Sequence, residues 1–151
     1  MAIDRIGVGF GILVLNSSGK ILLGRRNDNP EKAKSALHGE GTWTFPGGKL
    51  RPGEHVAQGA RRELEEEIGA QVTTSELEII CVNEDIVPDA HFITFGLLLR
   101  DYQGTVEIRE PDEITKWQWF EADNLPSNLF PASRKVLECF QTNRFCLTSK
   151  S

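Results

Sequence analysis

Apolar and polar residues alternate along the chain in segments that predict both strands and helices. The apolar run at residues 5–15 is rich in Val, Ile and Leu, which predicts a buried strand whose glycines permit close approach of a neighbouring backbone. The turn sequence NSSG and the run at 20–25 predict that a second strand forms a hairpin with the first. A long polar connection spans residues 27–41, and connections of this length often have a function.

Later segments have the composition of strands or the periodicity of helices. The expected strands are residues 42–45, 77–87, 91–100 and 115–120. The middle two of these are expected to pair. Residues 56–69 are expected to form a helix, because small and apolar residues recur at helical spacing and Gly69 suits its end. A second helix is expected from Pro131, a residue that favours a first helical position. Together these segments predict an α/β fold with helices packed on a sheet.

Length, charge and cysteine content limit the class of protein. The 151 residues predict a single domain spanning 1–151, with a tail that frays after about residue 145. The formal net charge of −5 argues against binding a nucleic-acid polymer or an anionic membrane, because both attract basic proteins. The sequence shows neither a signal peptide nor an apolar run long enough to span a membrane. The three cysteines follow no metal-binding spacing, which is typical of a reducing compartment. We therefore expect a cytoplasmic protein.

Residues 61–70, RRELEEEIGA, concentrate acids near the end of the expected helix. At about 100° per residue, Glu63, Glu66 and Glu67 share one patch beside the apolar stripe, whereas Glu65 points away. Like charges at this spacing repel, and the negative end of the helix dipole disfavours them further. Such a conflict is expected at a functional site, where a hard divalent cation such as Mg²⁺ would resolve it. A solvated acidic helix face is the alternative interpretation.

The loop before this helix favours the functional interpretation. It reads PGGKLRPGE at residues 46–54, and its glycines allow the backbone to approach a ligand closely. Lys49 and Arg51 add positive charge, and Glu54 opens the helix. Glycines, a lysine and clustered carboxylates together indicate a phosphate site bridged by a metal ion.

Residues 48–70, GKLRPGEHVAQGARRELEEEIGA, resemble the Nudix box, whose pattern is G-x5-E-x7-R-E-U-x-E-E-x-G-U with U a bulky or apolar residue. The fixed positions all match, although the small Ala70 fills the last apolar position. The resemblance implies an α/β/α sandwich around a mixed β-sheet. It also implies hydrolysis of a nucleoside diphosphate linked to a further group X, by attack of water on phosphorus, with Mg²⁺ as cofactor and Mn²⁺ as a substitute.

The same resemblance implies roles for individual residues. Metal ligation is implied for Glu63, Glu66, Glu67 and, through its carbonyl, Gly47. Glu66 could instead orient the attacking water as a base. Arg62 would brace the acids, and Glu54 would hold the loop against Arg62. The catalytic base varies within the family and stays unassigned.

Similarity outside the box favours a nucleoside triphosphate as substrate, cleaved to a nucleoside monophosphate and pyrophosphate. Family members that act on free triphosphates share a VGVG-like first strand, a W-x-x-PGG entry and an acid-rich segment before a W-x-W strand. This chain has GVGFG, TWTFPGGK and EPDEITKWQWF at these places. Phosphate or box contacts are expected from Gly48, Lys49 and Arg25 or Arg26. The expected base-binding aromatics are Trp43, Phe45, Phe92, Phe95 and Phe130. A further acid is expected from Glu110, Asp112 or Glu113.

Other functions stay open at this point. ADP-ribose or another nucleotide sugar is one alternative substrate, since a proline such as Pro88 often follows the box in ADP-ribose enzymes. A non-catalytic binding module is a second alternative, although such modules usually lose box acids. A diphosphate isomerase would need an active-site cysteine, and Cys81 lies far from the box in sequence. Ala132 and Ser133 stand where enzymes for oxidised purines carry adjacent acids, which disfavours that specificity. The expected partner is a small nucleotide, and an exposed sheet edge would suit a homodimer.

Overall fold

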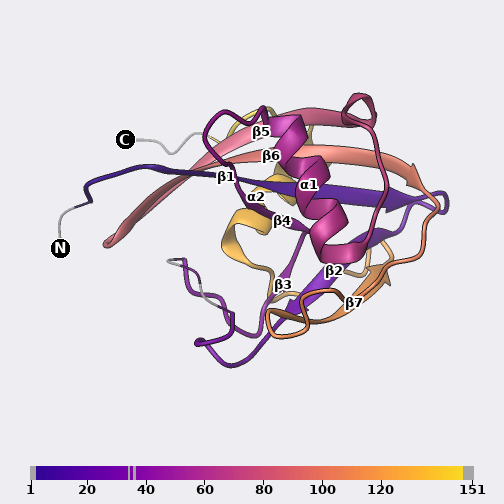
Figure 1. The fold of residues 1–151 in the computed structure, drawn as a ribbon, viewed down its shortest axis with the longest axis horizontal. Coiled ribbons are helices and arrows are strands. Elements are labelled where there is room, and N and C mark those ends of the chain that lie inside the picture. The colour runs from indigo at the N-terminus through magenta and orange to yellow at the C-terminus, as the bar shows by residue number, and fades with distance from the viewer. Residues whose placement is uncertain (1–2, 34, 36, 148–151) are drawn as a thin grey trace.

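The computed structural model describes residues 3–33, 35 and 37–147, in which a seven-stranded mixed sheet lies between two α-helices (Figure 1). In chain order the elements are β1 (Gly7–Asn16), β2 (Ile21–Arg26), β3 (Trp43–Thr44), β4 (Gly47–Lys49), α1 (Val56–Ile68), the 3-10 helix η1 (Thr74–Glu76), β5 (Leu77–Val87), β6 (Ala90–Tyr102), β7 (Ile114–Phe120) and α2 (Pro131–Thr142). In this part of the chain, no helix has the length and apolar character needed to cross a membrane.

The central strands β1 and β6 set the register of the sheet. They run parallel, from Gly7 opposite Phe92 to Asn16 opposite Tyr102, whereas the other pairings are antiparallel. The strand order is β3-β2-β1-β6-β5, with β4 also paired to β1 and β7 paired to β2. The predicted hairpin of β1 with β2 and the predicted pairing of β5 with β6 are both confirmed.

The edge of β1 that faces away from β6 is divided between two partners. β2 pairs with β1 near Leu15, and β4 pairs with it along Gly9–Gly11. A Cβ atom on Gly9 would lie 2.7 Å from the carbonyl oxygen of Gly48, so this approach needs glycine. We did not predict β4 from the sequence, because GGK has no apolar alternation and pairs through the backbone alone.

Side chains of β1 alternate between two cores on opposite faces of the sheet. Phe10 and Ile12 pack with Leu64 of α1 on one face. Leu13 points to the other face and packs with Val136 of α2. In Figure 1, α1 crosses in front of the sheet and α2 lies behind it. The layers are therefore those of an α/β/α sandwich around a mixed sheet.

Helix α1 follows the predicted apolar pattern and ends where the sequence indicates. Leu64 and Ile68 are completely buried, and burying a side chain of this size stabilises the fold by about 1.5–3 kcal/mol. Gly69 has a φ of 75° and donates its N–H to the carbonyl of Glu65 at 3.0 Å. This left-handed residue closes the helix one residue past Ile68.

Residues 145–147 return to the edge strand β5. The carbonyl of Phe145 accepts a hydrogen bond from the N–H of Val82 at 2.9 Å, and the N–H of Leu147 donates to the side chain of Asn83 at 2.9 Å. The chain is therefore held beyond residue 145, where we expected fraying to begin. Residues 148–151, the rest of the expected tail, lie outside the described residues.

The cap at Gly69 can be tested against Gly53, a second glycine with positive φ. Gly53 has a φ of 80° and open space around it, whereas a Cβ atom on Gly69 would collide with the side chain of Glu107. We expect Gly53→Ala to lower the free energy of unfolding by about 1–2 kcal/mol, the cost of a left-handed non-glycine residue, and Gly69→Ala to lower it further. Urea denaturation of both variants measures the difference. Equal losses would show that the contact with Glu107 contributes nothing.

Candidate active site

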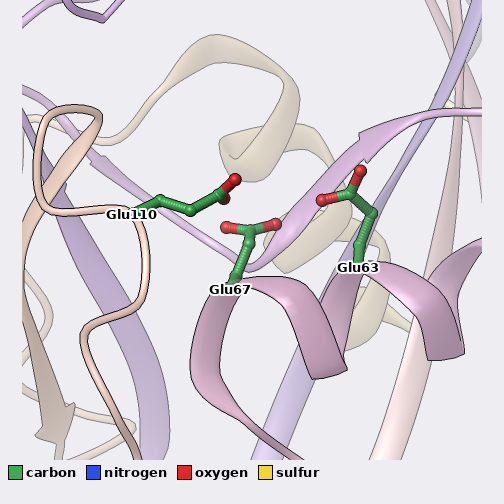
Figure 2. A group of neighbouring side chains, drawn as sticks. All are labelled: Glu63, Glu67 and Glu110. Carbon is green, nitrogen blue, oxygen red and sulfur yellow. The ribbon is translucent and has the colours of Figure 1, made fainter.

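Three carboxylates converge beside β4. Glu63 and Glu67 project from successive turns of α1, and Glu110 reaches them from the segment between β6 and β7 (Figure 2). One oxygen atom of each carboxylate lies within 4.8 Å of an oxygen of each of the others. Carboxylate oxygens are the ligands that Mg²⁺ and Mn²⁺ prefer. Within the described residues, these acids are the group arranged to hold a divalent cation.

Burial makes this cluster unfavourable for the protein alone. Only 6% of Glu67 is exposed. Its burial and the neighbouring Glu63 raise the pKa of Glu67 well above the usual value, against the effect of a hydrogen bond from the Gly47 N–H at 2.9 Å. Burial also raises the pKa of Glu63 and of Glu110. Because burial penalises the charged forms that a cation would bind, the donor set fits a divalent metal ion that supplies the missing positive charge.

The backbone of β4 forms one wall of the cluster. Besides the N–H that Gly47 donates to Glu67, a Cβ atom on Gly48 would lie 2.6 Å from the carboxyl group of Glu63. Any side chain at Gly48 would therefore displace that carboxylate. The implied role of the Gly47 carbonyl as a metal ligand stays a prediction.

Arg62 joins the acids of α1 to the loop before the helix. Its Nε and Nη2 atoms donate to the two carboxylate oxygens of Glu54 at 2.7 and 3.0 Å, and its Nη1 donates to Glu63 at 2.8 Å. Nη2 also donates to the carbonyl of Lys49 at 3.2 Å. A two-point contact of this kind fixes orientation as well as distance. These are the contacts that the implied bracing roles of Arg62 and Glu54 require.

Glu66 is the predicted carboxylate ligand that is not one of the three clustered acids. Its carboxylate pairs with Nη1 of Arg62 at 3.4 Å and with Arg51 at 3.9 Å, and 42% of its side chain is exposed. The third acid of the cluster is Glu110, one of the three residues, with Asp112 and Glu113, that were expected to supply a further acid. The role of Glu66 as ligand or base stays a prediction.

A pocket of about 270 Å³ opens beside the cluster, just below the usual range for ligand sites. Glu67 belongs to both, and Gly47, Gly48 and Lys49 form the shared border. The rest of the lining is mainly apolar, with polar groups from several elements: Gly9, Phe10, Gly11, Arg26, Ala33, Ser35, Leu37, Thr44, Phe45, Phe92, Thr94, Glu113, Ile114, Phe130, Ala132 and Ser133.

Not all of the predicted substrate residues reach this pocket. The lining includes Phe45, Phe92 and Phe130. Phe95 instead packs in the core beneath α1, because neighbouring residues of β6 face opposite sides of the sheet. Trp43 lies edge-on to Phe120, with ring centroids 5.1 Å apart.

The two consecutive arginines of β2 have different surroundings. Arg25 donates to the carbonyl of Gly41, pairs with Asp28 and lies over the ring of Trp43, 6.0 Å from its centroid. It is not among the residues that line the pocket. Arg26 lines the pocket and lies over the ring of Phe130, 4.5 Å from its centroid.

The pocket lining has hydroxyl groups from Thr94, which the sequence analysis did not single out, and from Ser133, which it noted only for lacking an acid. Thr94 is buried two residues after Phe92, on the same face of β6. The hydroxyl of Ser133 accepts a hydrogen bond from the N–H of Phe45 at 3.0 Å and lies 3.0 Å from the hydroxyl of Thr44. The alternation of HFITF gave a usable signal for Thr94, whereas nothing in the sequence indicated that the start of α2 would contact β3.

Cys81 has the properties of a core residue. It is completely buried among the residues that pack against α2, and burial together with Cys139 raises the pKa of its thiol to about 12. A thiol with such a pKa is a poor nucleophile near neutral pH. The chemistry of a cysteine-dependent isomerase is therefore disfavoured at Cys81.

The cost of burying Glu67 can be measured by replacing it with glutamine. Glu67→Gln removes a buried charge and keeps an oxygen for the Gly47 N–H. We expect its melting temperature without metal to exceed that of the wild type by about 2–4 °C, equivalent to about 1 kcal/mol. We also expect the rise in melting temperature on adding Mn²⁺ to disappear. Glu65→Gln, which neutralises an exposed acid on the same helix, should change neither the melting temperature without metal nor its rise on adding Mn²⁺. An unaltered response of Glu67→Gln to Mn²⁺ would contradict the assignment.

The contact of Glu54 with Arg62 predicts a defined dependence of stability on pH. Hydrogen bonds from Arg62, opposed by burial, lower the pKa of Glu54 from 4.5 to about 2. Because the pKa of Glu54 is lower in the folded state than in the unfolded state, its charge contributes to the free energy of unfolding. That contribution is fully present above about pH 4.5 and is lost as the pH falls toward about 2. We expect Glu54→Gln to be less stable than the wild type at pH 6, with a difference that shrinks at lower pH. Urea denaturation across this range tests it, and a constant difference would be the contrary result.

Comparison with known proteins places this geometry in a family. The family model of the NUDIX domain matches residues 5–140. An RNA pyrophosphohydrolase of Novosphingobium aromaticivorans is 29% identical over 145 residues, covering 83% of this chain and 84% of that protein. The CTP pyrophosphohydrolase of Escherichia coli is 30% identical over 131 residues, covering 87% of this chain and 89% of that protein.

A solved structure agrees with these matches. The crystal structure of a MutT NUDIX hydrolase from Burkholderia pseudomallei has a TM-score of 0.74 and 32% identity, covering 89% of this chain and 98% of that one. The family match includes the box, the acids Glu63 and Glu67 on α1, and Glu110. The chain therefore belongs to the Nudix hydrolase family.

Proposed function

We propose that the protein hydrolyses a ribo- or deoxyribonucleoside triphosphate to the nucleoside monophosphate and pyrophosphate, with a divalent metal ion. The oxygen of a water molecule forms a bond to phosphorus as the anhydride bond breaks. The released pyrophosphate takes the electron pair of that bond, and the proton that the water loses passes to solvent. Pyrophosphohydrolase chemistry is that of the family and of the named relatives. The proposal goes beyond this shared chemistry in naming a free nucleoside triphosphate as the substrate.

The continuity of the carboxylate cluster with the pocket is the observation that supports this choice. Glu67 belongs to the cluster and also lines the pocket, with Gly47–Lys49 between the two regions. A nucleotide with its phosphates at the cluster would place its base among Phe92, Phe130 and their neighbours. The pocket volume of about 270 Å³ suits one base rather than a polymer.

Glu63, Glu67 and Glu110 would hold the metal ion, which is Mg²⁺ or Mn²⁺ by the hardness of its oxygen ligands. A bound divalent cation supplies positive charge that offsets the phosphate charge and favours attack by water. The residues of the chain provide orientation. Arg62 fixes the carboxylate of Glu63, and the Gly47 N–H fixes that of Glu67.

The pocket supplies both apolar and polar contacts for a base. Phe92 and Phe130 offer aromatic surface for stacking. The hydroxyl groups of Thr94 and Ser133 are small donors or acceptors that can reach polar atoms at a base edge. Ala132 and Ser133 stand at the start of α2 in this lining, and neither supplies a carboxylate. Because these two positions lack the adjacent acids, we propose a base other than an oxidised purine.

A nucleotide sugar such as ADP-ribose and a 5′-triphosphorylated RNA are the competing substrates. The relative from Novosphingobium aromaticivorans is named for the second. The net charge of −5 disfavours a polyanion, because binding of RNA phosphates usually needs a basic surface. A substrate panel distinguishes a free nucleoside triphosphate, ADP-ribose and triphosphorylated RNA, because each of these substrates releases different products.

We expect a nucleoside triphosphate to give the highest kcat/KM in a panel of triphosphates, ADP-ribose and a triphosphorylated oligoribonucleotide, assayed with Mg²⁺ and with Mn²⁺. Pyrophosphate should be released only when a divalent metal is present. Glu67→Gln should lower kcat by at least about 100-fold, above the loss typical of groups that only support a metal ligand.

Two results would contradict the proposed reaction in different ways. A higher kcat/KM for ADP-ribose or for the oligoribonucleotide than for every triphosphate would overturn the substrate. Binding of nucleotides without turnover by the wild type would instead indicate a binding module.

A homodimer and a cytoplasmic location stay predictions. The molecular mass of the protein in solution tests whether it forms a dimer.

A further inference from the structure

The C-terminal end of α1 carries a concentration of negative charge that Arg62, on the same helix, offsets only in part. Its last turn includes Glu65, Glu66 and Glu67 and carries no basic residue. Carbonyl groups at a helix end lack partners within the helix, and the helix dipole adds partial negative charge there. Glu110 must approach this same end to join the cluster. Some other part of the chain therefore has to supply hydrogen-bond donors and positive charge.

Residues 105–110, the strap, supply the donors, and Arg109 supplies one positive charge within a segment that also carries Glu107 and Glu110. The N–H of Glu107 donates to the carbonyl of Ile68 at 3.0 Å, and the N–H of Arg109 donates to the carbonyl of Glu67 at 3.3 Å. The guanidinium of Arg109 donates through Nη1 to the carbonyl of Glu65 at 3.1 Å. A cation at a helix C-terminus is favourable both for the dipole and for its free carbonyls.

Glu110 follows Arg109 directly, so the strap determines where its carboxylate lies. On its other side, the carbonyl of Glu110 accepts hydrogen bonds from the N–H groups of Glu113 and Ile114 at 3.0 and 2.9 Å. The backbone at Glu110 is thus held between the end of α1 and the start of β7. Figure 2 shows the side chain extending from its loop toward Glu67.

From these contacts we infer that Arg109 is a positioning residue, which holds Glu110 within reach of the metal ion that Glu63 and Glu67 bind. It does so through the hydrogen bonds that its backbone N–H and its guanidinium donate to the last carbonyls of α1. The side chain of Arg109 is itself oriented by Glu107, whose carboxylate accepts from Nε at 3.1 Å. This role deepens the metal site of the proposed function and is independent of which nucleotide is hydrolysed.

Metal affinity without substrate is the direct test. We expect Arg109→Ala to bind Mn²⁺ about 10-fold more weakly, as measured by electron paramagnetic resonance or calorimetry, because a group supporting a ligand typically contributes that much. Arg109→Lys, which keeps the charge and a donor, should recover part of the affinity. Arg61→Ala is the matched control, since Arg61 also donates to a backbone carbonyl, that of Val72 at 2.9 Å, but does not touch the strap.

A double-mutant cycle with Glu110→Gln distinguishes this inference from the metal assignment beneath it. If Arg109 acts through Glu110, Arg109→Ala should not weaken Mn²⁺ binding further in the Glu110→Gln protein. Additive losses, or an equal loss in Arg61→Ala, would overturn the positioning role of Arg109. Unchanged Mn²⁺ affinity in Glu110→Gln alone would instead remove Glu110 from the metal site, while the roles of Glu63 and Glu67 would be judged separately by the Glu67→Gln variant.

Discussion

The hydrogen bond from the Gly47 N–H to the buried carboxylate of Glu67 is the contact on which the rest of the site depends. It requires α1 and β4 to lie close together, and glycines in β1 and β4 make that approach sterically possible. Its consequence is a carboxylate removed from water next to another carboxylate, which raises the pKa of Glu67. Arg62 donates to Glu54, Glu63 and Glu66, so the charge of Glu67 is left for a cation to balance.

The division of one edge of β1 between β2 and β4 explains how a single site uses both faces of the sheet. The acids Glu63 and Glu67 come from the helix on one face, whereas the pocket lining includes Thr94 of β6 and Ser133 of α2, the helix on the other face. The short strand β4 borders both. A phosphate chain at the cluster and a base in the pocket can therefore belong to one ligand, which is why the pocket and the acids are best understood together.

The acidic last turn of α1 is explained by the residues that pack against it in the tertiary structure. An acidic last turn conflicts with the helix dipole, yet the strap satisfies the carbonyls of Glu65, Glu67 and Ile68 and contributes the guanidinium of Arg109. The conflict that remains is among the carboxylates themselves. This uncompensated repulsion is what a metal site requires, because ligands whose charge was fully neutralised within the protein would have little affinity for a cation.

The sequence by itself determined the features that depend on local periodicity. The hairpins, the span of α1, its end at Gly69, and the proximity of Glu63 to Glu67 all follow from spacings of two or four residues, which have the same geometry in any environment. Only the tertiary structure decided that Glu110, rather than Asp112 or Glu113, joins these acids, because its position depends on contacts with a helix end more than 40 residues earlier. It also decided that Phe92 lines the pocket while Phe95 does not, since alternation tells which residues share a face but not what covers that face. Glu66 shows the same limit, because helical spacing places it beside Arg62 and the other acids of α1, whereas its contact with Arg51 depends on how the loop before the helix folds.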